Sequence, residues 1–87
     1  MILSVSLAIL KFDYFHIENK LYKKFDREII RIEPYLEEEK IKFKLNFNER
    51  MSIEELTTKV YDDYFDDFKV LTEETAKKLM LKEIKGE

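Results

Sequence analysis

Residues 40–47 read KIKFKLNF, a strict alternation of large apolar residues with lysine or asparagine. Successive side chains of a β-strand point to opposite faces of a sheet, so this pattern predicts a strand with one buried face and one wet face. The apolar positions are Ile41, Phe43, Leu45 and Phe47. The segment EPYLEEE supplies a turn before the strand, which we expect over residues 39–47. The chain therefore has to contain a sheet.

The last third of the chain predicts two helices. Ser52 and Glu55 form a capping box, and an apolar stripe with intervals of three and four residues follows them. The stripe consists of Ile53, Leu56, Val60, Tyr64, Phe68 and Leu71. It predicts a first helix over residues 52–70. Thr72 can cap a second helix over residues 73–85, and Gly86 is placed to end it.

The N-terminal segment MILSVSLAILKF predicts a strand over residues 2–17. Bulky and small residues alternate in it, and the bulky ones are Leu3, Val5, Leu7 and Ile9. The alternation breaks near Lys11, which indicates a bulge or a bend. A secretory signal is the alternative, but the segment has no basic n-region and no A-x-A cleavage site. The apolar run is also too short to span a bilayer, so we expect no membrane association.

Residues 17–32 fit either a strand or a helix. Several apolar residues keep helical spacing, namely Ile17, Leu21, Phe25, Ile29 and Ile32. The isoleucines at 29, 30 and 32 and the following Pro34 favour a strand instead. We therefore prefer a tight turn at Glu18 and Asn19, followed by a strand over residues 20–33, and leave the helix open.

Together these patterns predict one small α+β domain over residues 1–87. It would contain an antiparallel sheet of about three strands (2–17, 20–33 and 39–47), with two C-terminal helices (52–70 and 73–85) packed on one face. A sheet of three strands has open edges, which a small domain gains from burying against a second copy of itself. We therefore expect a homodimer.

The composition excludes several kinds of active site. The chain has one glycine, no cysteine and one histidine, which removes glycine-rich phosphate loops, cysteine zinc sites and thiol catalysis. His16 could act as a general base, but no nucleophile stands at a recognisable spacing from it. We expect no enzyme, no cofactor and no bound metal. The lack of cysteine is compatible with the cytoplasm.

Residues 61–68 read YDDYFDDF and carry the strongest charge feature of the chain. At 100° per residue, the predicted first helix turns its apolar stripe inward and its aspartates toward water. Those aspartates are Asp62, Asp63, Asp66 and Asp67, and Tyr61 and Phe65 stand at the edge of their face. Six acidic and two basic residues between 51 and 71 give −4, whereas the whole chain is −3. A metal site is disfavoured, because a straight helix offers two or three oxygen ligands where calcium takes six to eight.

Two interpretations of this acidic face stay open. It is either an ordinary solvated face, with Lys59 reaching Asp62 and Asp63, or a docking surface that offers charge for steering and aromatic rings for anchoring. Basic residues form a second candidate surface on the predicted strands. They are Lys23, Lys24, Arg27, Arg31, Lys40, Lys42 and Lys44. They could contact phosphates, or they could simply protect a strand edge from unwanted pairing.

From the sequence we expect a small non-catalytic binding protein. It would dock the acidic, aromatic-edged helix face onto a partner protein with a basic surface, such as one that handles nucleic acids. Phage or mobile-element inhibitors of host defence, of the anti-CRISPR kind, share this size and charge, which is an analogy and not a motif. The alternative is a nucleic-acid-binding or regulatory module that uses the basic residues. Direct nucleic-acid binding is less favoured, because the pI of about 5.3 lies far below the value of ~9 that such domains exceed.

Overall fold

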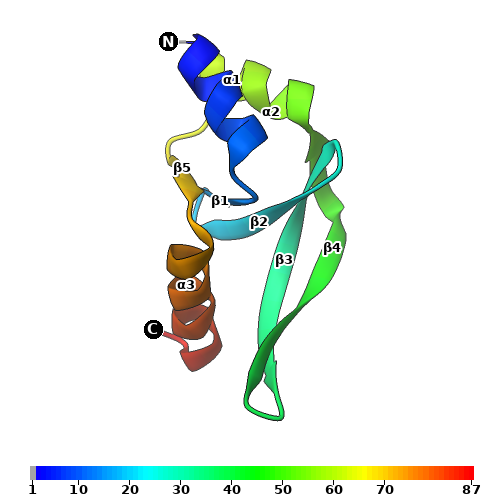
Figure 1. The fold of residues 1–87 in the computed structure, drawn as a ribbon, viewed down its shortest axis with the longest axis vertical. Helices are drawn as coiled ribbons and strands as arrows, with labels where there is room; N and C mark the ends of the chain where they lie inside the picture. Colours follow the sequence, from blue (N-terminus) through cyan, green and yellow to red (C-terminus); the bar gives the residue numbers. More distant parts are fainter. Residues whose placement is uncertain (1) are drawn as a thin grey trace.

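The fold is α+β, with a five-stranded antiparallel sheet and three helices over the part of the chain that the structure describes (Figure 1). This computed structural model describes residues 2–87, with side chains from residue 5 onward. The elements in chain order are α1 (Ile2–Lys11), β1 (Tyr14–Ile17), β2 (Lys20–Phe25), β3 (Glu28–Glu37), β4 (Lys40–Ser52), α2 (Ile53–Tyr61), β5 (Phe68–Leu71) and α3 (Glu73–Lys85). The strand order in the sheet is β4-β3-β2-β1-β5. The predicted sheet of three strands with two C-terminal helices is therefore wrong.

The predicted strand over residues 2–17 is replaced by helix α1 and the short strand β1. Val5, Ile9 and Phe12 stand four and three residues apart, which is helical spacing, and all three pack into one core. The break in the pattern near Lys11 marks the end of the helix and not a bulge. Lys24 stabilises that end, because its Nζ donates to the carbonyl oxygens of Ile9 (3.0 Å) and Leu10 (2.6 Å).

Residues 20–33 form strands and not a helix, but they belong to two strands instead of one. The chain turns between β2 and β3, where Asp26 has a φ of 54°. The turn predicted at Glu18 and Asn19 joins β1 to β2, and both residues have positive φ values (50° and 66°). Such turns match the right-handed twist of the strands that they join. The sheet is thus a meander of hairpins from β1 to β4.

Helix α2 ends at Tyr61, so the predicted helix over residues 52–70 is wrong beyond that point. Its start is as predicted, because the Ser52 side chain accepts a hydrogen bond from the Glu55 amide (2.9 Å). Asp63 adopts a φ of 58°, which a helix does not allow and which aspartate tolerates better than most residues. Farther on, residues 68–71 pair with β1 as strand β5. Pairing with a distant strand replaces local helical hydrogen bonds here.

The sheet carries a hydrophobic core on each face. One core lies under α1 and α2 and contains the buried residues Ile9, Phe15, Ile17, Tyr22, Ile29, Ile53 and Leu56. The other lies under α3 and contains Leu21, Ile32, Leu71, Ala76 and Met80. Figure 1 shows α1 and α2 above the short strands and α3 below them. The prediction that the helices pack on a single face of the sheet is therefore wrong, because helices cover both faces.

Helix α3 spans Glu73–Lys85, as the sequence predicts. Thr72 caps its start, and Gly86 ends it in the left-handed conformation with a φ of 76°. The long hairpin of β3 and β4 runs beside α3 and gives the molecule extents of 41 × 21 × 21 Å (Figure 1). Of the helices described here, none is long and apolar enough to cross a membrane.

Candidate functional site

The predicted acidic residues lie in the connection between α2 and β5. Together with Tyr61, the last residue of α2, this connection forms a segment that we call the acidic loop (residues 61–67). Asp62, Asp63 and Asp66 are exposed, and among the described residues their carboxylates form no ion pair. Tyr61 and Tyr64 are 60% and 66% exposed, which is unusual for rings of this size. The loop therefore presents three carboxylates and two aromatic rings to solvent.

The acidic loop is held at both ends. At its start the amides of Asp62 and Tyr64 donate to carbonyl oxygens of the last turn of α2, each at 2.9 Å. At its end Glu18, in the turn between β1 and β2, accepts from the Asp66 amide through Oε1 (3.0 Å) and donates its own amide to the Asp67 carbonyl (3.0 Å). These contacts tie the loop to the sheet, so its carboxylates project from a fixed backbone.

The roles predicted for the neighbouring aromatic residues and for Lys59 are corrected. Phe65, predicted at the edge of the acidic face, packs against the core under α1 and α2. Tyr64, predicted in the apolar stripe, is exposed and lies edge-on to Phe65 with ring centroids 5.2 Å apart. Lys59 pairs with Glu55 (3.3 Å) and lies 4.8 Å from the Tyr64 ring centroid, instead of reaching Asp62 and Asp63. The helix ends before these aspartates, which explains all three differences.

Asp67 differs from the other aspartates, because it contacts the sheet. Its Oδ2 lies 3.5 Å from Nδ1 of His16 in β1, and both side chains are partly shielded from solvent. His16 also lines a shallow pocket of about 360 Å³ between the β1–β2 turn and the end of α3. The lining consists of His16, Asn19, Leu21, Leu79, Lys82, Glu83 and Glu87. The contact with Asp67 links the end of the acidic loop to β1.

No three histidine, cysteine or carboxylate side chains gather as metal ligands within the described part of the chain. Asp62, Asp63 and Asp66 occupy turn and bend positions, and Asp67 contacts His16. Chelation of calcium needs six to eight converging oxygen atoms, and the loop does not bring that many together.

The basic residues predicted as a second surface do not form one patch. Lys23 lies on the α3 face, with its Nζ 4.5 Å from the centroid of the Tyr14 ring. Lys24 caps α1, as described above. Arg27 and Arg31 pair with the carboxylates of Glu54 and Glu49. Four of the seven residues are thus occupied in separate contacts.

The other three lysines lie together on the β3–β4 hairpin, on the face opposite α3. Glu33, Tyr35 and Glu37 of β3 stand directly across from them in the sheet, opposite Lys44, Lys42 and Lys40 respectively. Lys42 donates to Glu37 (2.6 Å), and the Nζ of Lys44 lies 5.8 Å from the Tyr35 ring centroid. The lysines therefore meet acidic residues within their own sheet, which weakens their attraction for phosphates.

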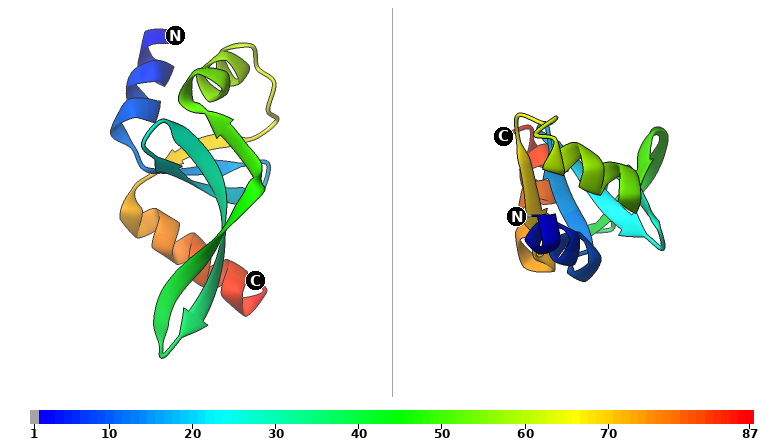
Figure 2. Two further views of the ribbon diagram at one scale, coloured as in Figure 1. Left: turned by 90° about the vertical axis from the view of Figure 1, so that its right-hand side faces the viewer. Right: turned by 90° about the horizontal axis from the view of Figure 1, so that it is seen from above.

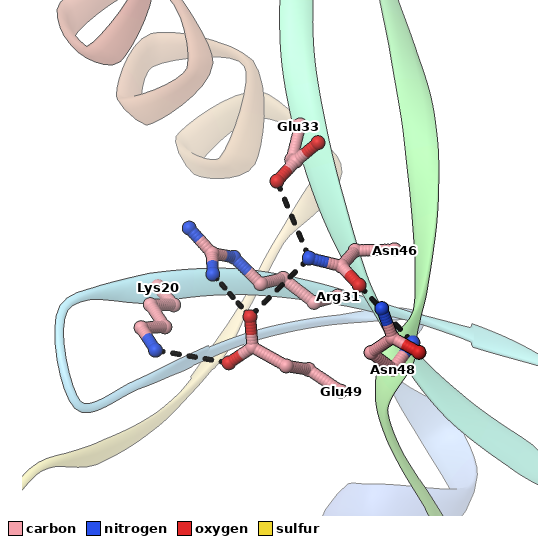
Figure 3. A network of polar contacts seen from close by, with 6 residues as sticks. All are labelled: Lys20, Arg31, Glu33, Asn46, Asn48 and Glu49. Atoms are coloured by element: carbon pink, nitrogen blue, oxygen red, sulfur yellow. Dashed lines mark hydrogen bonds and ion pairs between the residues drawn. The ribbon is translucent and has the colours of Figure 1, made fainter.

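A polar cluster that the sequence does not reveal surrounds Glu49 (Figure 3). The register of β3 and β4 shifts between Ile30 and Arg31, which pair with Arg50 and Asn46, so residues 47–49 have no partner in β3. This bulge turns Glu49 toward Lys20 (2.9 Å) and Arg31, across three strands of the sheet. Asn46 donates to the same carboxylate (3.3 Å). The contacts of Glu49 could not be predicted from the sequence, because a bulge of this length has no local sequence signature.

The contacts of Glu49 predict a pH-dependent contribution to stability. Hydrogen bonds from Lys20 and then Arg31 hold the pKa of the Glu49 carboxyl below its ordinary value. A carboxyl with a lowered folded-state pKa stabilises the fold above its unfolded-state pKa, and this contribution is lost as the pH falls through the folded-state pKa. Glu49→Gln should therefore lower the free energy of unfolding by about 1 kcal/mol at neutral pH. The difference from wild type should shrink below about pH 4.

Urea unfolding of wild type and Glu49→Gln at neutral and acidic pH measures this difference. Glu83→Gln, an exposed substitution on α3 with the same charge change, serves as the control and should stay within about 0.5 kcal/mol of wild type. If Glu49→Gln lowered the free energy of unfolding by the same amount at acidic and at neutral pH, the charge of Glu49 would not be the cause of the loss.

Comparison with known proteins leaves the function to be argued from the structure itself. The acidic loop presents Asp62, Asp63 and Asp66 to solvent, whereas the carboxylate of Glu49 pairs with Lys20 and Arg31. No protein-family model, no curated protein and no solved structure matches this chain.

Proposed function

We propose that this protein is a small non-catalytic binding protein whose acidic loop docks onto a basic surface of a partner protein. The observation that carries the proposal is the exposure of three unpaired aspartates beside Tyr61 and Tyr64 in the described part of the chain. Elsewhere, acidic side chains such as Glu37, Glu49 and Glu54 are paired with cations of the same molecule. The loop combines three exposed carboxylates that form no ion pair among the described residues with two exposed aromatic rings, and a basic partner could contact both.

Charge and rings have different roles in such an interface. Exposed carboxylates steer a basic partner and accelerate its association, and the effect weakens as salt is added. Tyrosines are frequent anchors, because they bury a large area and lose little conformational freedom on binding. The contacts of the loop with α2 and Glu18 keep the backbone in place before binding, which lowers the ordering cost.

The partner class follows from the negative charge that the loop presents. Proteins that handle nucleic acids carry basic grooves that bind a run of phosphates. A short, fixed row of carboxylates can occupy such a groove in place of the phosphate backbone. We therefore propose an inhibitor that competes with nucleic acid for its partner, as a phage or mobile-element inhibitor of host defence would.

Neutralisation of the loop tests the proposal. A variant with Asp62→Asn, Asp63→Asn and Asp66→Asn keeps Asp67, which contacts His16, so the anchoring of the loop is retained. The control removes the same charge from exposed sites elsewhere through Glu38→Gln, Glu39→Gln and Glu74→Gln. Proteins captured from a cell lysate by wild type and by the control, but lost with the loop variant, are then identified by mass spectrometry.

Direct binding measurements complete the test. The captured protein should bind wild type more weakly at about 300 mM than at about 50 mM salt, and a nucleic acid should displace it. The loop variant should bind at least tenfold more weakly, as should Tyr61→Ala with Tyr64→Ala. Equal binding by the loop variant and the control would refute the docking role. A mobility shift of nucleic acid by the protein alone, lost on Lys→Gln changes in the β3–β4 hairpin, would favour the nucleic-acid-binding alternative.

A further inference from the structure

Strand β4 forms an edge of the sheet, and its outer side has no partner strand among the described residues. Residues 40–46 pair in regular register with β3 on the inner side, which leaves a row of backbone amide and carbonyl groups on the outer side. The left view in Figure 2 looks toward this side of the molecule. The opposite edge, β5, has four residues, so β4 offers the longer template for an added strand.

Along this edge, charged side chains lie on one face of the sheet and apolar side chains on the other. Lys40, Lys42 and Lys44 are exposed on the face away from α3. The alternate residues Ile41, Phe43 and Leu45 are partly buried against the core under α3. An added strand would therefore place its own alternate residues beside lysines on one face and beside apolar groups on the other.

Strand β3 shows which chemistry matches this edge, because it already pairs with the inner side of β4. It places Glu33, Tyr35 and Glu37 across from the three lysines, and Pro34 and Leu36 across from Phe43 and Ile41. Acidic residues alternating with apolar ones thus satisfy both faces of β4. A strand with the same alternation on the outer side would place each lysine between two rows of acidic side chains.

A second copy of the chain fits this edge poorly. When two β4 edges pair antiparallel in the register that keeps like faces together, the lysines of one copy stand opposite the lysines of the other. A shift by one residue places the lysines opposite Ile41 and Phe43 instead. Both arrangements are unfavourable. The charge pattern of β4 therefore disfavours pairing between two copies of this edge and favours pairing with a strand that carries acidic residues.

We propose that the outer edge of β4 at residues 40–46 binds an extended segment of a partner protein in which acidic and apolar residues alternate. Backbone hydrogen bonds supply part of the affinity. Lys40 and Lys44 form no ion pair among the described residues and select the acidic residues, together with Lys42, which also pairs with Glu37. The bulge at residues 47–49 breaks the regular register and ends the binding edge. This surface is separate from the acidic loop and does not depend on its function.

A designed peptide tests the proposal without knowledge of the partner. The probe is a fluorescent peptide of sequence EVEYEVE, which alternates acidic and apolar residues over the length of the edge. The comparison peptides are EEEEVVY, with the same composition in blocks, and KVKYKVK, with the charge reversed. Fluorescence anisotropy should show binding of the alternating acidic peptide at least tenfold tighter than of either comparison peptide.

Variants of the chain locate the binding. Lys40→Gln, Lys42→Gln and Lys44→Gln together should weaken binding of EVEYEVE about tenfold or more. Lys77→Gln, Lys78→Gln and Lys85→Gln remove the same charge from α3 and should leave binding within about twofold of wild type. Backbone amide shifts in NMR spectra of the wild-type protein should change over residues 40–46, which tests the site even if the hairpin variant folds poorly.

Three outcomes would overturn the proposal. Equal binding of EVEYEVE and EEEEVVY would mean that charge alone acts and that no strand is added. Amide shifts confined to other elements would place the peptide elsewhere. Formation of a dimer through residues 40–46 that excludes the peptide would assign the edge to a second copy of the chain.

Discussion

Replacing Phe15 by alanine should lower the free energy of unfolding by about 4 kcal/mol. Phe15 is fully buried in β1, the strand between β2 and β5, and its ring stacks on Phe68 with centroids 6.2 Å apart. Removal of the ring leaves a cavity among residues of α1, α2 and both neighbouring strands, which cannot collapse without moving several elements. Small domains have a total stability of about 5–15 kcal/mol, so this loss would unfold a large fraction of the molecules on mild heating.

Urea unfolding followed by circular dichroism measures the effect of Phe15→Ala. Tyr61→Ala removes an aromatic ring that is 60% exposed, and it should change the free energy of unfolding by no more than about 0.5 kcal/mol. Similar losses of stability for the two substitutions would mean that Phe15 does not lie in the core under α1 and α2.

Replacing Ala76 by aspartate should destabilise the protein by roughly 3–5 kcal/mol. Ala76 is fully buried in the first half of α3, where it faces Leu21, Ile32 and Leu71 of the sheet. A carboxylate there loses its hydration and finds no cation in this apolar core. The substitution therefore separates α3 from the sheet, or it forces the carboxyl to bind a proton.

Thr75→Asp provides the control for this second substitution. It adds the same charge one position earlier, at an exposed site near the positive end of the helix, and should change stability by about 0.5 kcal/mol or less. Thermal unfolding of both variants compares them directly. If Ala76→Asp behaved like Thr75→Asp, α3 would not cover the second face of the sheet.

The features predicted correctly from the sequence are those that local contacts decide. The Ser52 cap, the whole of α3 and the turn at Glu18 and Asn19 each depend on residues within four positions of one another. The alternation in residues 40–47 predicts a strand, although the observed strand β4 continues to Ser52 through a bulge.

The errors arose where a distant part of the chain decides the structure. Residues 2–11 fit both a period of two and a helical period, and α2 packing on α1 favours the helix. Phe68 and Leu71 fit the stripe of a long helix, but pairing with Ile17 and Tyr14 makes them part of a strand. No pattern within residues 52–71 contains this information.

The candidate site shows the same division between local and distant effects. The aspartates were predicted to face water, and Asp62, Asp63 and Asp66 are exposed. Phe65 was predicted beside the aspartates, but Tyr64 is exposed there and Phe65 packs against the core. This difference arises because α2 ends at Tyr61. The alternation of Glu33, Tyr35 and Glu37 in β3 could have indicated acidic partners for the lysines, since a turn at Glu38 and Glu39 places them opposite.

The pairing of β5 with β1 has a consequence for the order in which the chain folds. Ile17 pairs with Phe68, which stands 51 positions farther along the chain (68 − 17), whereas the hairpins from β1 to β4 join neighbouring segments. Closing a long loop costs more entropy than forming a hairpin, so the meander can assemble early and β5 joins late. The backbone of residues 61–67 is fixed only when that last strand docks. A nascent chain that lacks residues 68–87 would therefore form the meander while residues 61–67 still lack the strand that fixes their C-terminal end.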